Sequence, residues 1–336
     1  MKKLSLAYFG SPDFAADFLE KLLTDKDLLR LIEVTLVVTQ KDKFVGRRQI
    51  LTATPVKIIT EKYKITNNTS FPPPIGVEGR LRRESMRLDP LLREDDKKIT
   101  LNFELDTLKN IDLALVYAYG DLIPKELLTL PKYGFWNIHP SLLPKYRGPS
   151  PIAAPLINGD KTTGVTIIKM DKEIDHGPII AQESLTIEID DKRPDLEKKL
   201  TNLAYKMFKE IMGKIPTGDK KFRSEPFIAQ NHKLATYTKK LTKQDGFIEF
   251  KKIKNALTPN PYLPDEALAK SGSLTVYNLF RGLYPWPGLW TILPNGKRLK
   301  ITCLEWVNGK LIIKKVQMES KNEVDFTTFN KAYKIF

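Results

Sequence analysis

Apolar and polar positions along the first 214 residues predict strands that are each followed by a helix. Four apolar runs have the length and composition of buried parallel strands: 4–10, 34–39, 111–120 and 134–139. Apolar residues recur with helical spacing in two segments between them, 14–23 and 55–63. Strands that alternate with helices are typical of a doubly wound, Rossmann-like α/β sheet, and we expect that fold here.

The pattern changes further along the chain. Segments 164–170 and 178–187 read as paired strands around a tight turn, and 194–213 has helical spacing. Beyond residue 231 the apolar segments are short, bounded by turn residues and mostly β-like: 246–250, 288–293, 298–306 and 310–316. This pattern predicts a small β-barrel that follows the α/β domain.

Domain boundaries follow from these changes. We predict a first domain at 1–207, a linker at 208–231 that contains Pro216, Gly218 and Pro226, and a second domain at 232–336. Two stretches do not fit the pattern. The stretch 66–98 combines a proline cluster with several arginines, and 253–280 interrupts the β-like region.

Charge is distributed unevenly over the 336 residues. The net charge is +15, and residues 231–336 hold 18 Lys or Arg against 8 Asp or Glu, so +10 of it lies in the last third. A basic module suggests a polyanionic partner such as a nucleic acid, because phosphate contacts release counterions. A generic solvated surface is the alternative that charge alone leaves open.

Composition also argues against several classes of protein. One cysteine, Cys303, excludes an intrachain disulfide, and three scattered histidines provide no zinc-ligand spacing, so no metal is expected. No apolar run approaches the roughly 20 residues of a membrane helix, and the opening residues read as a strand rather than a signal peptide. The turn at 10–13 lacks the spaced glycines of NAD or FAD sites. We expect a cytoplasmic protein.

Asn137 and His139 are the first candidates for chemistry. They end the apolar run 134–139, they share one face because strand side chains alternate, and Pro140 stops the strand after them. Open α/β sheets bind ligands at the carboxyl ends of their strands, so an amide donor beside an imidazole there can be catalytic. Hydrogen bonding to the next turn is the alternative interpretation.

Several blocks together resemble the methionyl-tRNA formyltransferases, which use a folate. The blocks that resemble the catalytic domain of that family are FGSPDFA, VVTQKDKFVGRRQILTATPVK, VYAYGDLIPKELL, NIHPSLLPKYRGPSPI and GVTIIKMDKEIDHGPI. The last two resemble formyltetrahydrofolate-using transferases in general, including those that act on glycinamide ribonucleotide and on amino sugars. TYTKKLTKQDGFIEF and FRGLYPWPGLWTILPNGKRLKI resemble the OB-like tRNA-binding domain of the methionyl-tRNA enzymes.

The resemblance assigns roles to particular residues. It implies that Asn137, His139 and Asp175 are catalytic, and it alone prefers Asp175 to the nearby Asp171. The positions that it implies for folate binding are Ser141, Leu142, Leu143, Pro144, Tyr119 and Gly120. Arg47 matches an arginine linked to the tRNA acceptor end, and its neighbour Arg48 is grouped with it. His176 and Glu173 depart from the family pattern.

The implied reaction is transfer of a formyl group from 10-formyltetrahydrofolate to methionyl initiator tRNA, by direct attack of the amine. Such a transfer needs a donor for the developing oxyanion and a group that moves protons, work suited to an asparagine and an imidazole paired with a carboxylate. We expect a monomer. Two alternatives stay open: a folate-dependent transferase that acts on a small amine such as a sugar nucleotide or glycinamide ribonucleotide, and a non-catalytic RNA-binding protein with this fold.

Overall fold

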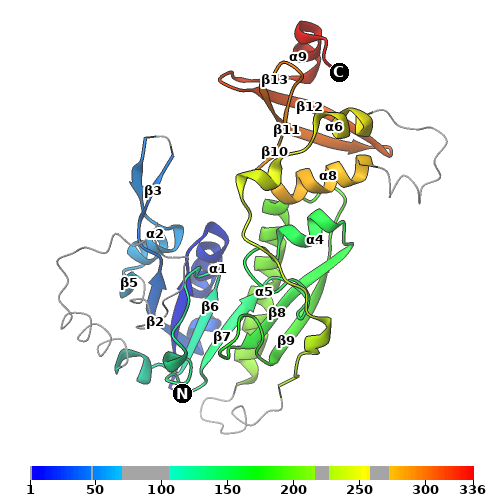
Figure 1. The fold of residues 1–336 in the computed structure, drawn as a ribbon. Helices are drawn as coiled ribbons and strands as arrows, with labels where there is room; N and C mark the ends of the chain where they lie inside the picture. The colour runs from blue at the N-terminus through cyan, green and yellow to red at the C-terminus, as the bar shows by residue number, and fades with distance from the viewer. Residues whose placement is uncertain (1, 47, 70–105, 216–226, 258–271) are drawn as a thin grey trace. The chain divides into compact units, whose positions relative to one another are not determined.

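The computed structural model describes residues 2–46, 48–69, 106–215, 227–257 and 272–336, drawn as ribbon in Figure 1. These residues form two compact units. The first unit contains Met1–His139, Thr166–Gln182 and Thr201–His232. The second contains Pro140–Val165, Glu183–Leu200 and Lys233–Phe336.

Seven of the described strands form one sheet in the order β5-β2-β1-β6-β7-β8-β9. Their bounds are Leu4–Gly10 (β1), Ile32–Thr39 (β2), Asn67–Thr69 (β5), Leu113–Tyr117 (β6), Phe135–His139 (β7), Thr162–Lys169 (β8) and Ile179–Thr186 (β9). The pairs from β5 to β7 are parallel, and β8 runs antiparallel to β7. The chain crosses from one strand to the next out of sequence order, so the predicted Rossmann-like α/β sheet is confirmed.

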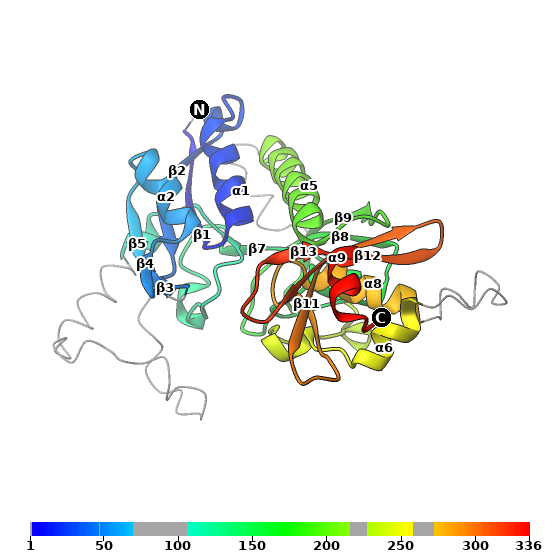
Figure 2. The same ribbon diagram turned by 90° about the horizontal axis from the view of Figure 1, so that it is seen from above.

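Buried aromatic rings fix the helices of the first unit against this sheet. Helix α1 (Asp13–Thr24) lies beside helix α5 (Arg193–Lys214), as Figure 2 shows, and α2 (Pro55–Lys62) packs on α1. Phe18 of α1 is fully buried and meets Tyr117 of β6 and Tyr205 of α5 edge to face. Contacts of this geometry contribute beyond the burial of apolar area, so they hold α1 to both the sheet and α5. The hydroxyl groups of Tyr117 and of Thr201 on α5, 3.1 Å apart, add a hydrogen bond between α5 and the sheet.

Polar contacts tie α5 to the end of α1 as well. The carboxylate of Asp25 accepts hydrogen bonds from Lys209 Nζ at 2.6 Å and from the hydroxyl of Tyr205. The hydrogen bond from Lys209, then that from Tyr205, hold the pKa of Asp25 well below its usual value. Asp25 therefore stays ionised and links the two helices over the whole physiological pH range.

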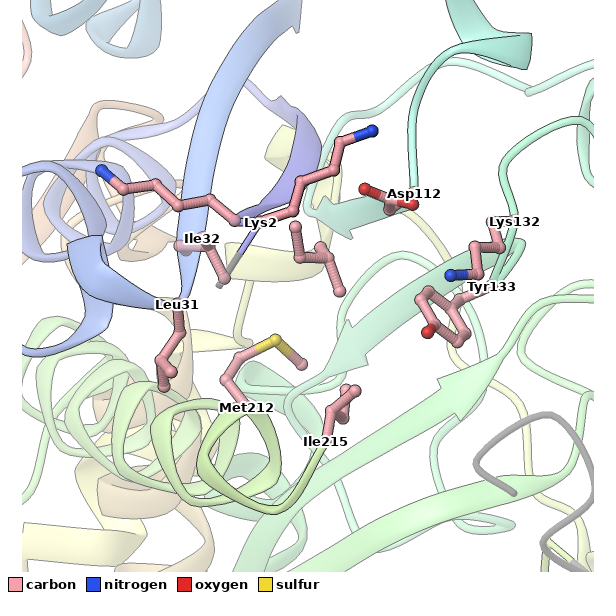
Figure 3. A pocket seen from close by; sticks show the side chains of 10 residues that line it. Lys2, Leu31, Ile32, Asp112, Lys132, Tyr133, Met212 and Ile215 are labelled. Atoms are coloured by element: carbon pink, nitrogen blue, oxygen red, sulfur yellow. The ribbon is translucent and has the colours of Figure 1, made fainter. Parts of the chain in front are cut away.

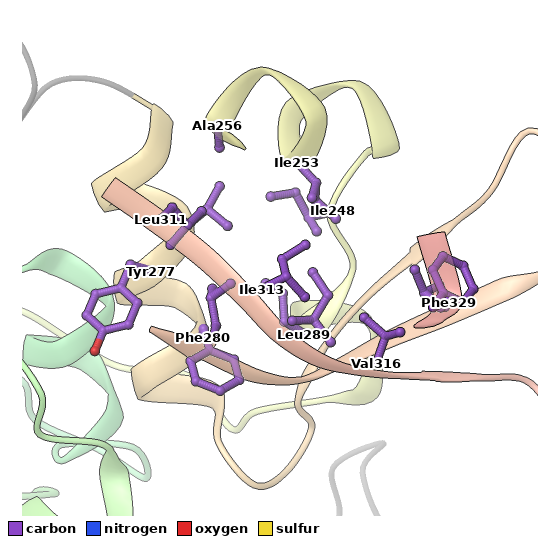
Figure 4. Close-up of a cluster of buried hydrophobic side chains, with 14 of the residues drawn as sticks. Ile248, Ile253, Ala256, Tyr277, Phe280, Leu289, Leu311, Ile313, Val316 and Phe329 are labelled. Atoms are coloured by element: carbon purple, nitrogen blue, oxygen red, sulfur yellow. The ribbon is translucent and has the colours of Figure 1, made fainter. Parts of the chain in front are cut away.

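The second unit contains a separate antiparallel sheet. Its four strands are β10 (Leu289–Ile292), β11 (Arg298–Val307), β12 (Lys310–Met318) and β13 (Glu323–Asp325), paired in that order. Helices α6 (Phe250–Leu257), α8 (Gly272–Leu283) and α9 (Phe326–Tyr333) pack on it, and α4 (Ala153–Asn158) packs on α8. Figure 4 shows the resulting core, with Phe280, Ile313 and Val316 pointing inward.

Most of the strands expected in this region are present. Segment 246–250 is an exception, because Phe247 makes only a single bridge to Trp290 and helix α6 begins at Phe250. The stretch 253–280 contains parts of α6 and α8, and its residues 258–271 lie outside the described chain. Of the stretch 66–98, the structure describes only 66–69. Among the helices that the structure describes, none is long and apolar enough to cross a membrane.

Candidate active site

Strand β7 presents Asn137 and His139 on one face at its carboxyl end. It pairs with β6 on one side, where Val116 is opposite Asn137, and with β8 on the other, where Thr166 is opposite His139. His139 is 4% exposed and Asn137 is half-buried. Trp136 and Ile138, which alternate with them along the strand, are buried. Because strand side chains alternate, Asn137 and His139 lie on the same face.

Asp175 reaches these two residues from the turn between β8 and β9. Its Oδ1 accepts a hydrogen bond from the amide of Asn137 at 3.0 Å and lies 3.5 Å from Nδ1 of His139. The Asp175 side chain is only 10% exposed. The structure therefore brings together the three side chains that the resemblance singled out, although 38 residues separate Asn137 from Asp175.

The neighbouring carboxylate, Asp171, has different partners. Its Oδ2 lies 2.7 Å from Nδ1 of His176, and its Oδ1 accepts the backbone N–H of Glu173 at 2.9 Å. Hydrogen bonding of an aspartate to the backbone two residues on is typical of a turn. Geometry thus separates the two candidate carboxylates: Asp175 faces Asn137 and His139, whereas Asp171 binds within its own loop.

The turn 171–177 has an unusual backbone. Asp175 has a φ of 52°, in the left-handed region that few residues other than glycine adopt. At Gly177 a Cβ atom would lie 1.8 Å from the carbonyl oxygen of Lys169, so no larger residue fits there. The turn is consequently a tight structure that requires support from the chain around it.

Part of that support comes from a residue that the sequence did not indicate. Gln230 is 5% exposed, and its side-chain amide donates to the backbone carbonyls of Asp175 at 3.0 Å and Gly177 at 2.7 Å. It lies in the predicted linker 208–231, where no periodicity or motif distinguishes it. Only the folded chain reveals that contact.

The positions expected to bind folate lie in two places. Tyr119 and Gly120 follow the carboxyl end of β6 in the first unit, with Tyr119 buried and Gly120 exposed at a φ of 90°. The segment 141–144 follows β7 along the chain and belongs to the second unit. Ser141 is fully buried there, and its hydroxyl donates to the carbonyl of Lys145 at 2.6 Å. Leu142 and Pro144 are half-buried, and Leu143 is buried.

Arg48, one of the two arginines expected at the tRNA, belongs to a short exposed hairpin. It consists of β3 (Lys43–Val45) and β4 (Ile50–Thr52), and it exposes four large apolar side chains: Phe44, Val45, Ile50 and Leu51. Arg48 is exposed between the two strands, and Arg47 lies outside the described residues. An apolar and basic hairpin of this kind is suited to contact a partner rather than a core.

A pocket of about 240 Å³ lies at the amino-terminal ends of the strands, and none of the candidate residues lines it. Figure 3 shows Leu31, Ile32, Met212 and Ile215 around it, near the amino-terminal ends of β1 and β2. Ligands of open α/β sheets bind at the carboxyl ends of the strands. Asn137 and His139 lie at the end of the sheet where such ligands bind, and this pocket does not. Among the residues that the structure describes, no cluster of three or more His, Cys, Asp or Glu has the arrangement of a metal site.

Comparison with known proteins points to a single family. Residues 2–212 match the family model described as Formyl transferase. The chain is 35% identical to the methionyl-tRNA formyltransferase of Caldicellulosiruptor saccharolyticus, over 90% of this chain and 80% of that protein. It is 32% identical to that of Thermotoga maritima, over 95% of this chain and all of that protein.

A solved structure shows the same fold at lower identity. The N-formyltransferase of Helicobacter canadensis, which was crystallised with folinic acid and dTDP-3-aminofucose, superimposes with a TM-score of 0.51. The match covers 95% of both chains at 19% sequence identity.

Proposed function

Because the chain belongs to the methionyl-tRNA formyltransferase family, we propose that it transfers the formyl group of 10-formyltetrahydrofolate to the amino group of methionyl initiator tRNA. The product, formylmethionyl-tRNA, serves translation initiation. The observation that carries the proposal is the contact of Asn137, His139 and Asp175 at the carboxyl end of β7.

Asn137 has the donor that the reaction needs. Attack of the methionyl amine on the formyl carbon gives a tetrahedral adduct whose oxygen gains negative charge. The side-chain amide of asparagine has two hydrogens, and one of them binds Asp175, which leaves the other to donate to that oxygen. Because Asp175 fixes the amide before the substrate arrives, the donor needs little reorganisation during the reaction.

His139 and Asp175 can move the protons. The attacking amine loses a proton as the new C–N bond forms, and the folate nitrogen gains one as its C–N bond breaks, so one proton crosses the site in each turnover. His139 is buried beside Asp175, whose carboxylate favours a hydrogen on Nδ1 of the ring. In that tautomer the other ring nitrogen, Nε2, carries the lone pair that can accept the proton and pass it on.

Family membership also suggests which residues bind the co-substrate and the tRNA. We assign the folate to Tyr119, Gly120 and the segment 141–144, and the acceptor end of the tRNA to the hairpin with Arg47 and Arg48. The domain division at 1–207, 208–231 and 232–336 belongs to the same proposal. The antiparallel sheet β10–β13 and its helices would form the OB-like, basic tRNA-binding domain.

Formylation of charged tRNA tests the function directly. Purified protein is incubated with 10-formyltetrahydrofolate and methionyl initiator tRNA, and formylmethionine released from the tRNA is measured. Uncharged tRNA is the matched control, because it offers the same phosphates without the reactive amine. Formylation of an amino-sugar nucleotide or of glycinamide ribonucleotide in place of the tRNA would overturn the proposed acceptor and support the alternative of a small amine.

A further inference from the structure

The position of the Asp175 carboxylate depends on a backbone conformation that an aspartate rarely adopts. With a φ of 52°, the residue lies in the left-handed region, which costs of the order of 1 kcal/mol or more for a residue with a side chain. An extended conformation at Asp175 would redirect the side chain away from Asn137 and His139. Some contact outside the turn must therefore hold the backbone in place.

Gln230 makes that contact with both carbonyls that flank the bend. One side-chain amide donates to the carbonyl of Asp175 at 3.0 Å and to that of Gly177 at 2.7 Å. The residue is 5% exposed, so water competes little for these hydrogen bonds. Because one rigid NH₂ group binds both carbonyls, the distance between the two carbonyls is fixed. This in turn fixes the direction of the Asp175 side chain.

The chain around Gln230 is itself anchored on both sides. Ile228 exchanges both backbone hydrogen bonds with Ile179 at the start of β9, at 2.8 and 3.0 Å. On the other side, the ring of His232 stacks on that of His176 with centroids 3.9 Å apart and planes 5° from parallel. The segment 228–232 thus forms a strap across the turn, with Gln230 at its centre.

From this geometry we infer that Gln230 is a positioning residue of the formyl transfer, one that aims Asp175 at Asn137 and His139 through the backbone of the turn. The inference rests on the proposed function. Its side-chain amide donates to the carbonyls of Asp175 and Gly177, so we expect it to act on the reaction through the backbone of the turn. Its loss should affect the rate of transfer rather than the binding of the tRNA.

Two substitutions test the role. Gln230→Met keeps the length and removes the donors, and it should lower kcat by about 10- to 100-fold while KM for tRNA changes less than about twofold, because a misplacement of about 1 Å can cost a hundredfold in rate. Gln230→Glu places a carboxylate against two carbonyls. A protonated carboxyl regains one donor, so the kcat of this variant relative to the unmodified protein should recover as the pH falls, whereas that of Gln230→Met should not.

Asn110→Leu is the matched control, because the side-chain amide of Asn110 also donates to a backbone carbonyl, that of Asp106, at 3.0 Å, and Asn110 lies in the first unit outside the segments proposed for chemistry, folate or tRNA. It should leave kcat unchanged. All rates are measured below the thermal unfolding midpoint of each variant, and should Gln230→Met fail to fold, the pH dependence of Gln230→Glu decides the question.

The outcomes separate the two levels of the argument. Active unmodified protein together with a Gln230→Met variant whose kcat stays within about twofold would overturn the positioning role alone. So would a Gln230→Glu variant whose relative kcat does not change with pH. Unmodified protein that forms no formylmethionyl-tRNA would overturn the proposed function, and the positioning role would fall with it.

Discussion

Replacing Asn137 with aspartate changes one group at the centre of the site and almost nothing in size. In the folded protein the amide nitrogen of Asn137 lies 3.0 Å from Oδ1 of Asp175, and Asn137→Asp puts an oxygen at that place. The substitution therefore removes the donor proposed for the oxyanion and brings two carboxyl groups together. Each effect has a magnitude that can be worked out separately.

The loss of the donor acts on the reaction. Removal of one oxyanion donor typically raises the barrier by about 3 to 4 kcal/mol, so kcat should fall by about 10²- to 10³-fold. This loss does not depend on pH, because neither form of the new side chain has a second hydrogen to offer after it binds Asp175. Asn137→Ala should show a loss of the same size without the added charge.

The carboxyl pair acts on folding. Two unit charges at 3.0 Å repel by about 5 kcal/mol at an effective dielectric constant of about 20, so the folded variant should hold one proton between the two groups. The unfolded chain releases that proton more readily, and the variant should lose stability relative to the unmodified protein as pH rises above about 4. Urea unfolding at pH 5 and pH 8 measures the difference.

Single-turnover rates and these urea unfolding curves together test the prediction for Asn137→Asp. The prediction requires a large loss of kcat at both pH values and a loss of stability that is greater at pH 8. A variant with kcat within about tenfold of the unmodified protein would show that Asn137 is no oxyanion donor. Equal stability at the two pH values would show that its side chain does not face Asp175 in solution.

Three further changes test other parts of the structure. His139→Ala should lower kcat by about 10²- to 10⁴-fold with little change in the Kd for tRNA, measured by filter binding. Lys209 and Tyr205 hold the pKa of Asp25 low, so Asp25→Asn should cost about 1 to 2 kcal/mol of unfolding free energy at pH 7. That cost should begin to shrink as pH falls below the unfolded-chain pKa of roughly 4, and it should be lost only as pH falls through the much lower folded pKa, so urea unfolding should show a smaller cost at pH 3 than at pH 7 but still a measurable one. Leu299→Ala should destabilise the fully buried core of the second unit by about 2 to 5 kcal/mol, as measured by urea unfolding.

The binding of tRNA should also depend strongly on salt, since the proposal assigns affinity to phosphate contacts.

Sequence patterns predicted the elements of the first 214 residues well because those elements follow simple periodicities. The run 4–10 became β1 with the same bounds, and the helical spacing of 194–213 lies within α5. Parallel strands buried on both faces give continuous apolar runs, which are hard to confuse with other elements of that length. Segment 246–250 was wrong because a short apolar run does not tell a strand from the approach to a helix, here α6 at Phe250.

The candidate site was predictable only in part, and the reason is the distance along the chain over which it is assembled. Asn137 and His139 share a strand, so the two-residue period alone places them on one face. No local rule chooses Asp175 over Asp171, four residues earlier, and only the resemblance to the family did so. The choice follows from the folded turn, where a left-handed backbone turns Asp175 toward Asn137 and leaves Asp171 to His176.

Gln230 was harder still to predict from the sequence than Asp175. It lies 55 residues from Asp175 in a segment whose composition reads as a linker, and its amide reaches a backbone carbonyl rather than a side chain. Every residue type carries a backbone carbonyl, so a hydrogen bond to a carbonyl requires no particular residue type at the position that accepts it. No spacing of residue types in the sequence could therefore have pointed to Gln230. In this site the sequence is informative about the groups proposed to do the chemistry, and the fold is needed to find the group proposed to position one of them.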